Sequence, residues 1–363
     1  MLKFKPAVFA VENDYIIAVR VNEPCVMWVE VADESYYDQS NGILRSATTL
    51  HKMKLPASVL DGAGKYTVCY RRVIERKPYF SKLEEVERVE FSFRSVPKDE
   101  ARAYHVADAH GIVESTVAAA STFAELHGGI DFLILNGDVI DHSGAVENFD
   151  AIYEIAARIT GGCVPIVFSR GNHDTRGIYA ENIADYTPTR DGFSYFTFRL
   201  GSIWGMVLDC GEDKLDDNEE YGHTICCRDF RMGETRYLES VIARADEEYN
   251  QEGVTKRIIT CHVPFTERFE PPFNIEEDTY AYWTRLIGEN IKPDVMICGH
   301  LHKMLLFKPG SEYDAYGQSF PVSVTSMCDY KKRYHAGAGY VFGNDGITVS
   351  CVDANGVIKE YKI

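Results

Sequence analysis

The chain has no long apolar segment, no excess of basic residues and no regularly paired cysteines. No run of about eighteen apolar amino acids occurs in its 363 residues, which excludes an ordinary transmembrane helix. The first fifteen residues carry two lysines, but their apolar stretch is short and is soon followed by Glu12 and Asp14, so we expect no secretory signal peptide. Ten cysteines are scattered without a C-x-x-C pair, and a chain of this size needs no disulfide staples. We therefore expect a cytoplasmic protein without a membrane partner.

Basic residues are in the minority. The sequence has 38 Lys and Arg against 55 Asp and Glu, which gives a formal net charge of −17. Proteins that bind nucleic acid by neutralising phosphates usually carry a basic face, so the charge balance disfavours a nucleic-acid partner. The hydrophobic fraction of 45 % is ordinary for a folded protein, and the length suggests about two domains.

The first 97 residues have the pattern of an all-β domain. Four segments rich in β-branched and aromatic residues are bounded by turn residues, and no helical period appears between them. These segments are 15–21, 25–31, 66–73 and 86–94. Residues 60–66 resemble the approach to the tyrosine corner of fibronectin type III domains. Residues 1–97 are therefore predicted to form a small β-sandwich of that type, folding as its own unit, with a linker at 95–100.

From residue 101 onward, short apolar runs alternate with amphipathic segments. Helical spacing of apolar residues occurs at 112–126, 145–159, 234–247 and 279–287. Six apolar runs lie between them, at 104–107, 132–135, 165–168, 203–208, 257–260 and 295–298. Such runs suit strands that are covered by helices, and the tail from residue 320 returns to strands. We predict that residues 98–363 form an α/β domain.

Side chains that can bind metals follow five of the six apolar runs. They occur in Asp108-Ala-His110, Gly137-Asp138, Gly171-Asn172-His173-Asp174, His262 and Gly299-His300-Leu-His302. Because open α/β sheets bind ligands at the carboxyl ends of their strands, we expect these elements to meet in one crevice. Carboxylate, imidazole and amide donors without thiolate suit divalent or trivalent Mn, Fe or Zn rather than a structural cysteine-type zinc site. The glycines before Asp138, Asn172 and His300 are expected to allow sharp turns.

The order D-x-H, G-D-x-x-D, G-N-H-D, H and G-H-x-H resembles the calcineurin-like metallophosphoesterase superfamily over about residues 101–304. The resemblance implies a four-layer α/β/β/α sandwich with two metal ions. The ligands it implies are Asp108, His110, Asp138 and His302 for one ion, and Asp138, Asn172, His262 and His300 for the other. It further implies hydrolysis of a phosphomonoester or phosphodiester by in-line attack of a metal-bound hydroxide, without a covalent phosphoenzyme.

Four more residues take expected roles from the same resemblance. His173 would act on the leaving oxygen as an acid or an electrostatic partner, with Asp141 orienting its ring. Arg176 falls where serine/threonine phosphatases of the superfamily keep a phosphate-binding arginine, although an arginine there can also face solvent. His142 stands where those phosphatases have another arginine, and it is a second candidate for substrate binding. Purple acid phosphatases also carry an N-terminal β-domain, but they have a tyrosine ligand in place of Asp141, so no iron–tyrosinate centre is expected here.

The acidic loop 211–233 follows a strand end directly and is a candidate lid over the substrate crevice. His51 and His127 are predicted to lie at the surface, and His105 in the core or behind the ligands. Two alternatives to a phosphatase stay open. A nuclease-type phosphodiesterase would need a basic approach to the metals, and a non-catalytic scaffold would normally lack a ligand, whereas none is missing here.

Overall fold

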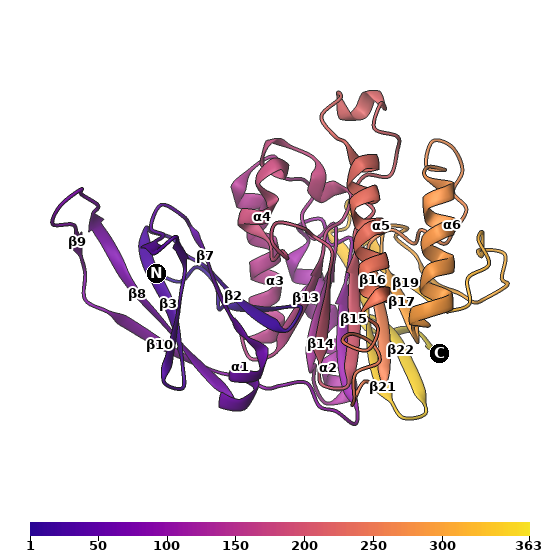
Figure 1. Ribbon diagram of the computed structural model, residues 1–363. Helices are drawn as coiled ribbons and strands as arrows, with labels where there is room; N and C mark the ends of the chain where they lie inside the picture. Colours follow the sequence, from indigo (N-terminus) through magenta and orange to yellow (C-terminus); the bar gives the residue numbers. More distant parts are fainter.

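The computed structural model describes all 363 residues, and two β-sheets packed face to face form its centre (Figure 1). The order of the larger, ten-stranded sheet is β23 (Gly356–Lys362), β22 (Gly346–Asp353), β21 (Tyr334–Gly343), β11 (Ala101–Val106), β12 (Phe132–Asn136), β13 (Pro165–Ser169), β1 (Ala7–Val11), β2 (Asp14–Arg20) and β7 (Leu50–Pro56), with β20 (Met327–Asp329) paired to β21. The order of the six-stranded sheet is β14 (Phe196–Leu200), β15 (Ile203–Leu208), β16 (Lys256–Cys261), β17 (Val295–Cys298), β19 (Val322–Thr325) and β18 (Met304–Phe307). All six predicted apolar runs are strands of these two sheets.

Helices cover both outer faces of the sheet pair (Figure 1). The helices on the larger sheet are α2 (Val113–His127) and α3 (Asp150–Thr160), which pack against β21, β22, β12 and β1. The helices on the smaller sheet are α5 (Cys227–Ala243) and α6 (Glu277–Leu286), which share an apolar core with β15, β16 and β17. Since the two sheets also contact each other, the predicted four-layer α/β/β/α sandwich is confirmed. No helix is both long enough and apolar enough to span a lipid bilayer.

The observed helix ends agree with the prediction where neighbouring residues determine them, and differ where a residue distant in the sequence caps the helix. Gly128 and Gly161 end α2 and α3 in the left-handed conformation, with φ of 78° and 64°, as the sequence predicts. The start predicted for the third helix, at residue 234, is wrong, because α5 begins at Cys227. The carboxylate of Asp216 accepts hydrogen bonds from the backbone N–H groups of Cys227 and Arg228 at 3.0 and 3.1 Å. A cap eleven residues away leaves no local mark in the sequence.

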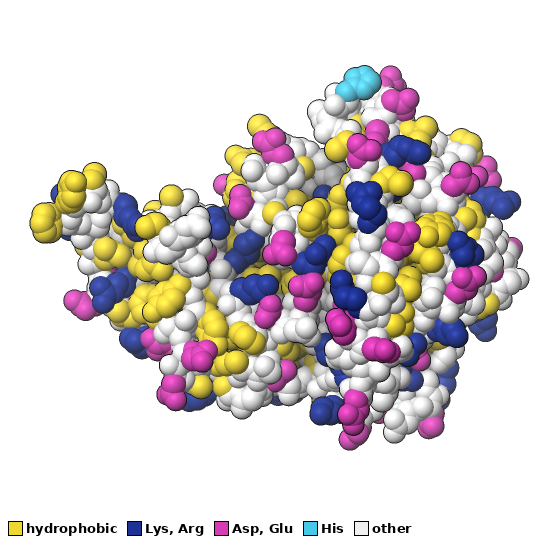
Figure 2. All heavy atoms as spheres, viewed as in Figure 1, with side chains coloured by type: hydrophobic (Ala, Val, Ile, Leu, Met, Phe, Trp, Pro, Cys, Tyr) yellow, Lys and Arg dark blue, Asp and Glu magenta, His cyan; other side chains and the backbone are white.

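The N-terminal part also contains a separate, five-stranded sheet. Its order is β10 (Glu87–Ser92), β8 (Lys65–Glu75), β3 (Cys25–Val31) and β4 (Glu34–Tyr37), with β9 (Lys82–Leu83) paired to β8, and a small ribbon of β5 (Gln39–Ser40) and β6 (Ile43–Leu44) lies nearby. The hairpin between β8 and β9 projects from this lobe and carries hydrophobic side chains at its tip (Figures 1 and 2). The expectation of no helix is wrong, because α1 (Ala57–Ala63) occupies most of the segment compared with a tyrosine corner.

The first 97 residues are joined to the rest of the molecule by a shared sheet. Strand β1 pairs in parallel with β13, with Val8 opposite Pro165 and Phe9 opposite Ile166. Strands β2 and β7 extend the same sheet, and they face the five-stranded sheet to complete a sandwich. All five residues of β1 are buried, as in an interior strand rather than an edge strand. The sandwich of residues 1–97 therefore shares one sheet with the α/β part, while the domain boundary at residue 97 stays a prediction.

Two histidines predicted at the surface lie elsewhere. His51 is fully buried: its Nδ1 lies 2.6 Å from Asp38 Oδ2, and its Nε2 lies 3.3 Å from Cys25 Sγ. Because all three side chains are enclosed between strands, this set is a structural polar network. His127 is half-buried, with Nε2 3.1 Å from Ser350 Oγ.

Candidate metal centre

The five motif elements meet at the carboxyl ends of strands from both sheets. They follow β11, β12, β13, β16 and β17, which are neighbours in the two packed sheets. Three groups of side chains have their donor atoms within 4.8 Å of one another. The groups are Asp108, His110 and His302; Asp108, Asp138 and His262; and His110, Asp138 and His173. Strand order alone therefore brings residues nearly 200 positions apart into one place.

Asp138 lies at the middle of this constellation. Its Oδ2 is 3.2 Å from His262 Nε2 and 4.0 Å from His110 Nε2. The second buried carboxylate, Asp108, lies between two histidines, with its Oδ1 3.3 Å from His302 Nε2 and 3.7 Å from His262 Nε2. The remaining two predicted ligands, His300 and Asn172, approach to 3.1 Å between Nδ1 and Oδ1. The structure thus brings all seven residues together.

Several of these polar atoms contact other candidate ligands but make no hydrogen bond within the protein. Asp108 Oδ1 and His262 Nε2 are buried without a hydrogen bond. Burial lowers the pKa of His262, but the Asp138 and Asp108 carboxylates outweigh it and raise that pKa to about 10. Buried polar groups normally have partners, so these donors and the negative charge around them fit bound cations.

The backbone at the site is held in an unusual conformation. Five of the seven residues have left-handed φ between 43° and 70°: Asp108, His110, Asp138, His300 and His302. Non-glycine residues adopt this region at an energetic cost, and such strain is concentrated at functional sites. The left-handed turn directs the side chain after each strand end toward the shared crevice.

The glycines that precede the ligands serve two different needs. Gly137 has a φ of +76° and makes the sharp turn that was predicted for it. For Gly171 and Gly299 the reason is space instead, because a Cβ would collide with Asp138 at the first position and with Ala107 at the second. The expected sharp turn is therefore replaced there by close packing of two loops.

Three residues to which the sequence analysis gave no role hold the ligands in place. Ser326 Oγ and the backbone N–H of His300 both donate to Asp108 Oδ2, the latter at 2.8 Å. His262 Nδ1 lies 2.7 Å from the backbone oxygen of Asn136, whose side chain bonds to β16 and β17. Asp174 accepts bonds from the N–H groups of Gly171 and Asp138, and burial, followed by the Asp138 charge, raises its pKa to about 7. Only Asp174 had a local signal, as the last residue of the G-N-H-D motif.

His105 lies behind the ligands, as predicted. It is fully buried, with Nε2 3.0 Å from the side-chain nitrogen of Asn136 and Nδ1 3.0 Å from Thr325 Oγ1. The ring therefore supports the same asparagine that orients His262.

Asp141 is placed differently from the prediction. The ring Nδ1 of His173 contacts the backbone carbonyl oxygen of Asp141 at 2.9 Å, rather than its carboxylate. The carboxylate instead lies 3.4 Å from His110 Nδ1 and is more than half exposed. A main-chain carbonyl therefore orients the His173 ring, and the identity of residue 141 matters less to it than the loop conformation.

The two predicted substrate-binding residues are already engaged. Arg176 Nε and Nη2 bond to the two carboxylate oxygens of Glu212 at 2.9 and 3.0 Å, and its Nη1 lies 3.3 Å from His173 Nε2. His142 Nδ1 accepts a hydrogen bond from Gly144 N at 3.0 Å, within its own exposed loop. Arg176 thus lies next to the site as part of an ion pair. The contacts of His142 stay within its own loop and do not support a role in substrate binding.

Replacing Arg176 by Met is expected to lower the free energy of unfolding by about 2–4 kcal/mol. Glu212 has no solvent-exposed side-chain surface, so removal of the arginine leaves a buried carboxylate without a cationic partner, held only by the Thr175 hydroxyl at 2.8 Å. The double variant Arg176→Met, Glu212→Gln should recover much of that loss in urea denaturation. Arg158→Met is the matched control, since its partner Glu114 is exposed and the pair contributes less than about 1 kcal/mol. Equal losses in the two single variants would contradict the role assigned to the Arg176 pair.

The segment 211–233 borders the site, as predicted, but the loop itself ends at Cys226, because residues 227–233 are the first turns of α5. Asp213 and His300 line the same small cavity, and Tyr221 Oη donates to Asp213 at 2.9 Å. Arg231 in the first turns of α5 is buried and donates to the backbone oxygens of Cys210 and Glu212, which anchors the start of the loop.

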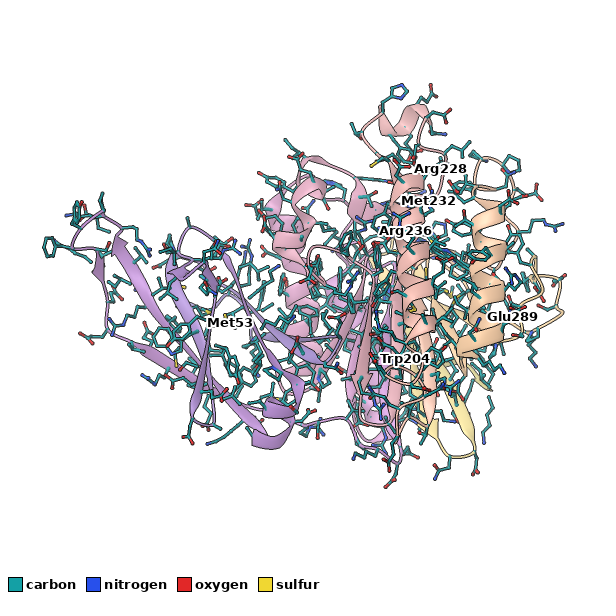
Figure 3. All side chains as sticks on the ribbon, in the orientation of Figure 1. Met53, Trp204, Arg228, Met232, Arg236 and Glu289 are labelled. Atoms are coloured by element: carbon teal, nitrogen blue, oxygen red, sulfur yellow. The ribbon has the colours of Figure 1, made fainter.

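The opposite side of α5 carries Arg228, Met232 and Arg236 along its outward face (Figure 3).

An aromatic residue on the other side of the site went unnoticed in the sequence. The Tyr330 ring lies 4.8 Å from that of His110 and 6.1 Å from that of His302, between ring centroids. It is followed by Lys331, Lys332 and Arg333 in an exposed turn. The crevice thus has a basic turn on this side and an acidic loop on the other.

Comparison with known proteins places this architecture in a family. A family model described as calcineurin-like phosphoesterase matches residues 101–304, more than half of the chain. A purple acid phosphatase, PPD1 from yellow lupin (Lupinus luteus) seeds, is similar in structure, with a TM-score of 0.63 and 11% identity over 99% of this chain and 73% of that one. GAP50, the anchor in the inner membrane complex of Plasmodium, has a TM-score of 0.48 and 12% identity over 73% of this chain and 89% of its own. No curated protein matches in sequence. The chain belongs to the calcineurin-like phosphoesterase family.

Proposed function

We propose that this protein is a dinuclear metal-dependent hydrolase that cleaves a phosphomonoester or a phosphodiester. The observation that carries the proposal is the set of seven oxygen and nitrogen donors at the strand ends of the two packed sheets, with Asp108 Oδ1 and His262 Nε2 buried without a hydrogen bond. The family supports a metal-dependent phosphoesterase, and a set of seven donors is large enough to support the proposal of two ions. An N/O set without thiolate favours Mn, Fe or Zn.

We assign the donors to two ions that share Asp138. The first would be held by Asp108, His110, Asp138 and His302, and the second by Asp138, Asn172, His262 and His300. When bound, two such ions lower the pKa of a water and neutralise charge on the phosphoryl oxygens. The protein's part is to fix the donors: the Asn136 carbonyl holds His262 Nδ1, which leaves Nε2 directed at Asp138.

His173 is the residue we assign to the leaving oxygen. Its backbone N–H donates to Asp138 Oδ1 at 2.9 Å, so its position is tied to the metal ligands. The Asp141 carbonyl is an acceptor only, so it requires the proton on Nδ1 and leaves Nε2 as the atom that can hold or transfer a second proton. A general acid at this position would contribute about 10²–10⁴-fold to the rate.

A comparison of leaving groups tests this function and the role of His173. His173→Ala is expected to lower the turnover of an alkyl phosphate by about 10²-fold or more, and that of 4-nitrophenyl phosphate much less, because nitrophenolate leaves with little protonation. Metal content, measured by elemental analysis, should stay near two ions per chain. His223→Ala, on an exposed loop position, is the control and should change neither rate by more than about twofold.

Three results would contradict parts of this proposal. Equal losses on both esters would make His173 an electrostatic contact to the phosphoryl group rather than an acid. Loss of metal would make it a ligand. A wild-type chain that binds two ions but hydrolyses no mono- or diester would favour the non-catalytic scaffold. A phosphate ester as substrate, the absence of nucleic-acid binding and a cytoplasmic location stay predictions from the sequence.

A further inference from the structure

A cavity of about 660 Å³ lies between the segment that follows β13 and the segment 211–233, which consists of a loop and the first turns of α5. Ile178, Tyr221, Ile225 and Phe230 form its apolar walls. The volume falls within the range of about 300–1,000 Å³ that is usual for small-molecule sites. None of the seven donor residues lines it, so it is a space next to the metal centre rather than a part of it.

Arg176 and Thr175 connect this cavity to the metal centre. Both line the cavity, and Arg176 Nη1 lies 3.3 Å from His173 Nε2. Thr175 Oγ1 donates to the backbone oxygen of Asn172 at 2.8 Å. If His173 faces the leaving oxygen, as the proposed function has it, the part of the substrate beyond that oxygen extends past Arg176 into the cavity.

The charges around the cavity are unfavourable for a second anionic group. Arg176 is neutralised by Glu212, and Glu220 lies 3.4 Å from its Nη1. Arg170, the other lining cation, is paired with Asp209 at 2.7 Å. The acidic residues in the lining are Glu181, Glu212 and Glu220. No lining cation is without a carboxylate partner, and the acids outnumber the arginines.

We propose that this cavity binds the alcohol portion of the substrate and selects apolar alcohols that bear an amine, or no charge, over alcohols that bear a second anionic group. A carboxylate or a second phosphate would lose hydration without gaining a free cation. Glu220 and the face of Tyr221 are already in contact with Lys214, at 2.9 Å from its Nζ and 5.8 Å from the ring centroid. Glu181 is the lining carboxylate that makes no ion pair within the protein, so an ammonium group would be attracted to it. The direction of the substrate rests on the proposed function, whereas binding in the cavity can be measured without catalysis.

Three phenols separate charge from leaving-group chemistry, because the phenolic pKa is about 10 in each. They are tyramine, 4-ethylphenol and 3-(4-hydroxyphenyl)propionate, which carry an amine, no charge and a carboxylate. Calorimetric titration of the metal-loaded full chain is expected to show tyramine binding about tenfold more tightly than the propionate, with ethylphenol between them. Their phosphate monoesters should follow the same order in kcat/KM.

Two neighbouring lysine variants locate the effect. Thr224 lines the cavity, whereas His223 is exposed next to it and does not. Thr224→Lys should strengthen propionate binding and weaken tyramine binding, each by about three- to tenfold, because the new charge lies within the cavity. His223→Lys adds the same charge outside and should change both affinities by less than about twofold, since solvent screens it.

The outcomes distinguish this inference from the proposed function. Equal binding of tyramine and the propionate, or equal responses to the two lysine variants, overturns the cavity assignment. If none of the three esters is hydrolysed by a chain that holds two ions, while tyramine is still preferred and Thr224→Lys reverses that preference, the cavity assignment stands and the proposed function is wrong.

Discussion

Replacement of Asp138 by Asn is expected to lower phosphoesterase turnover by about 10³-fold or more and to reduce the metal content well below two ions per chain. The Asp138 carboxylate is the only proposed donor shared by both sites, with His262 Nε2 at 3.2 Å and His110 Nε2 at 4.0 Å. A neutral amide has one oxygen donor and no charge, so it cannot bridge two cations as a carboxylate does. Elemental analysis after dialysis against a weak chelator, together with turnover of 4-nitrophenyl phosphate, measures both effects.

Asp174→Asn is the matched comparison for Asp138→Asn. This carboxyl group is also buried and also contacts the loops that carry the ligands, but it accepts backbone N–H groups instead of facing the other donors. Both backbone N–H groups donate to the same oxygen, Oδ2, so a single amide oxygen can accept the same two bonds. We expect Asp174→Asn to retain both ions and to lower turnover by less than about tenfold. If Asp138→Asn retained both ions and full turnover, the bridging assignment would be wrong.

A chain that begins at Lys98 is expected not to fold cooperatively. This truncation removes β1, which would expose the edge of β13 and open the hydrophobic core that the two parts of the molecule share. Phe9 shows the scale of the loss: its ring packs edge-on against Tyr153 and Phe168, at 6.3 Å between centroids in each case. Replacing that single residue by Ala should lower the free energy of unfolding by about 3–5 kcal/mol.

Circular dichroism and thermal denaturation would measure the effect of this truncation. The double variant Tyr79→Ser, Phe80→Ser, at the exposed tip of the β8–β9 hairpin, is the control and should change the melting temperature little, because these side chains are 80% and 94% exposed. All seven proposed ligands come after residue 97, so the truncated chain loses none of them directly. A soluble, sharply melting chain from Lys98 that holds two ions would contradict this expectation and would show that the α/β part folds alone.

The sequence by itself determined which residues gather at the site. Each group of ligands closely follows an apolar run, and the carboxyl ends of neighbouring strands in an α/β sheet share one edge, although only the structure shows that two packed sheets contribute to the site. Asp108, Asp138 and His262 could therefore be grouped without coordinates. Local glycine signals likewise determined where α2 and α3 end.

Only the tertiary structure decided what each side chain contacts. Arg176 binds Glu212, the Asp141 carboxylate turns to His110, and His51 is buried with Asp38, all through partners brought in from other segments. Hydrophobic periodicity reports that a surface is covered, but it does not identify the covering element. For the same reason the sequence does not show that the buried run Ala7–Val11 belongs to the larger sheet. Its neighbour β13 lies more than 150 residues away in the chain. The hydrogen bonds that join the two strands are made by backbone groups, which are the same in every sequence and leave no pattern in the side chains.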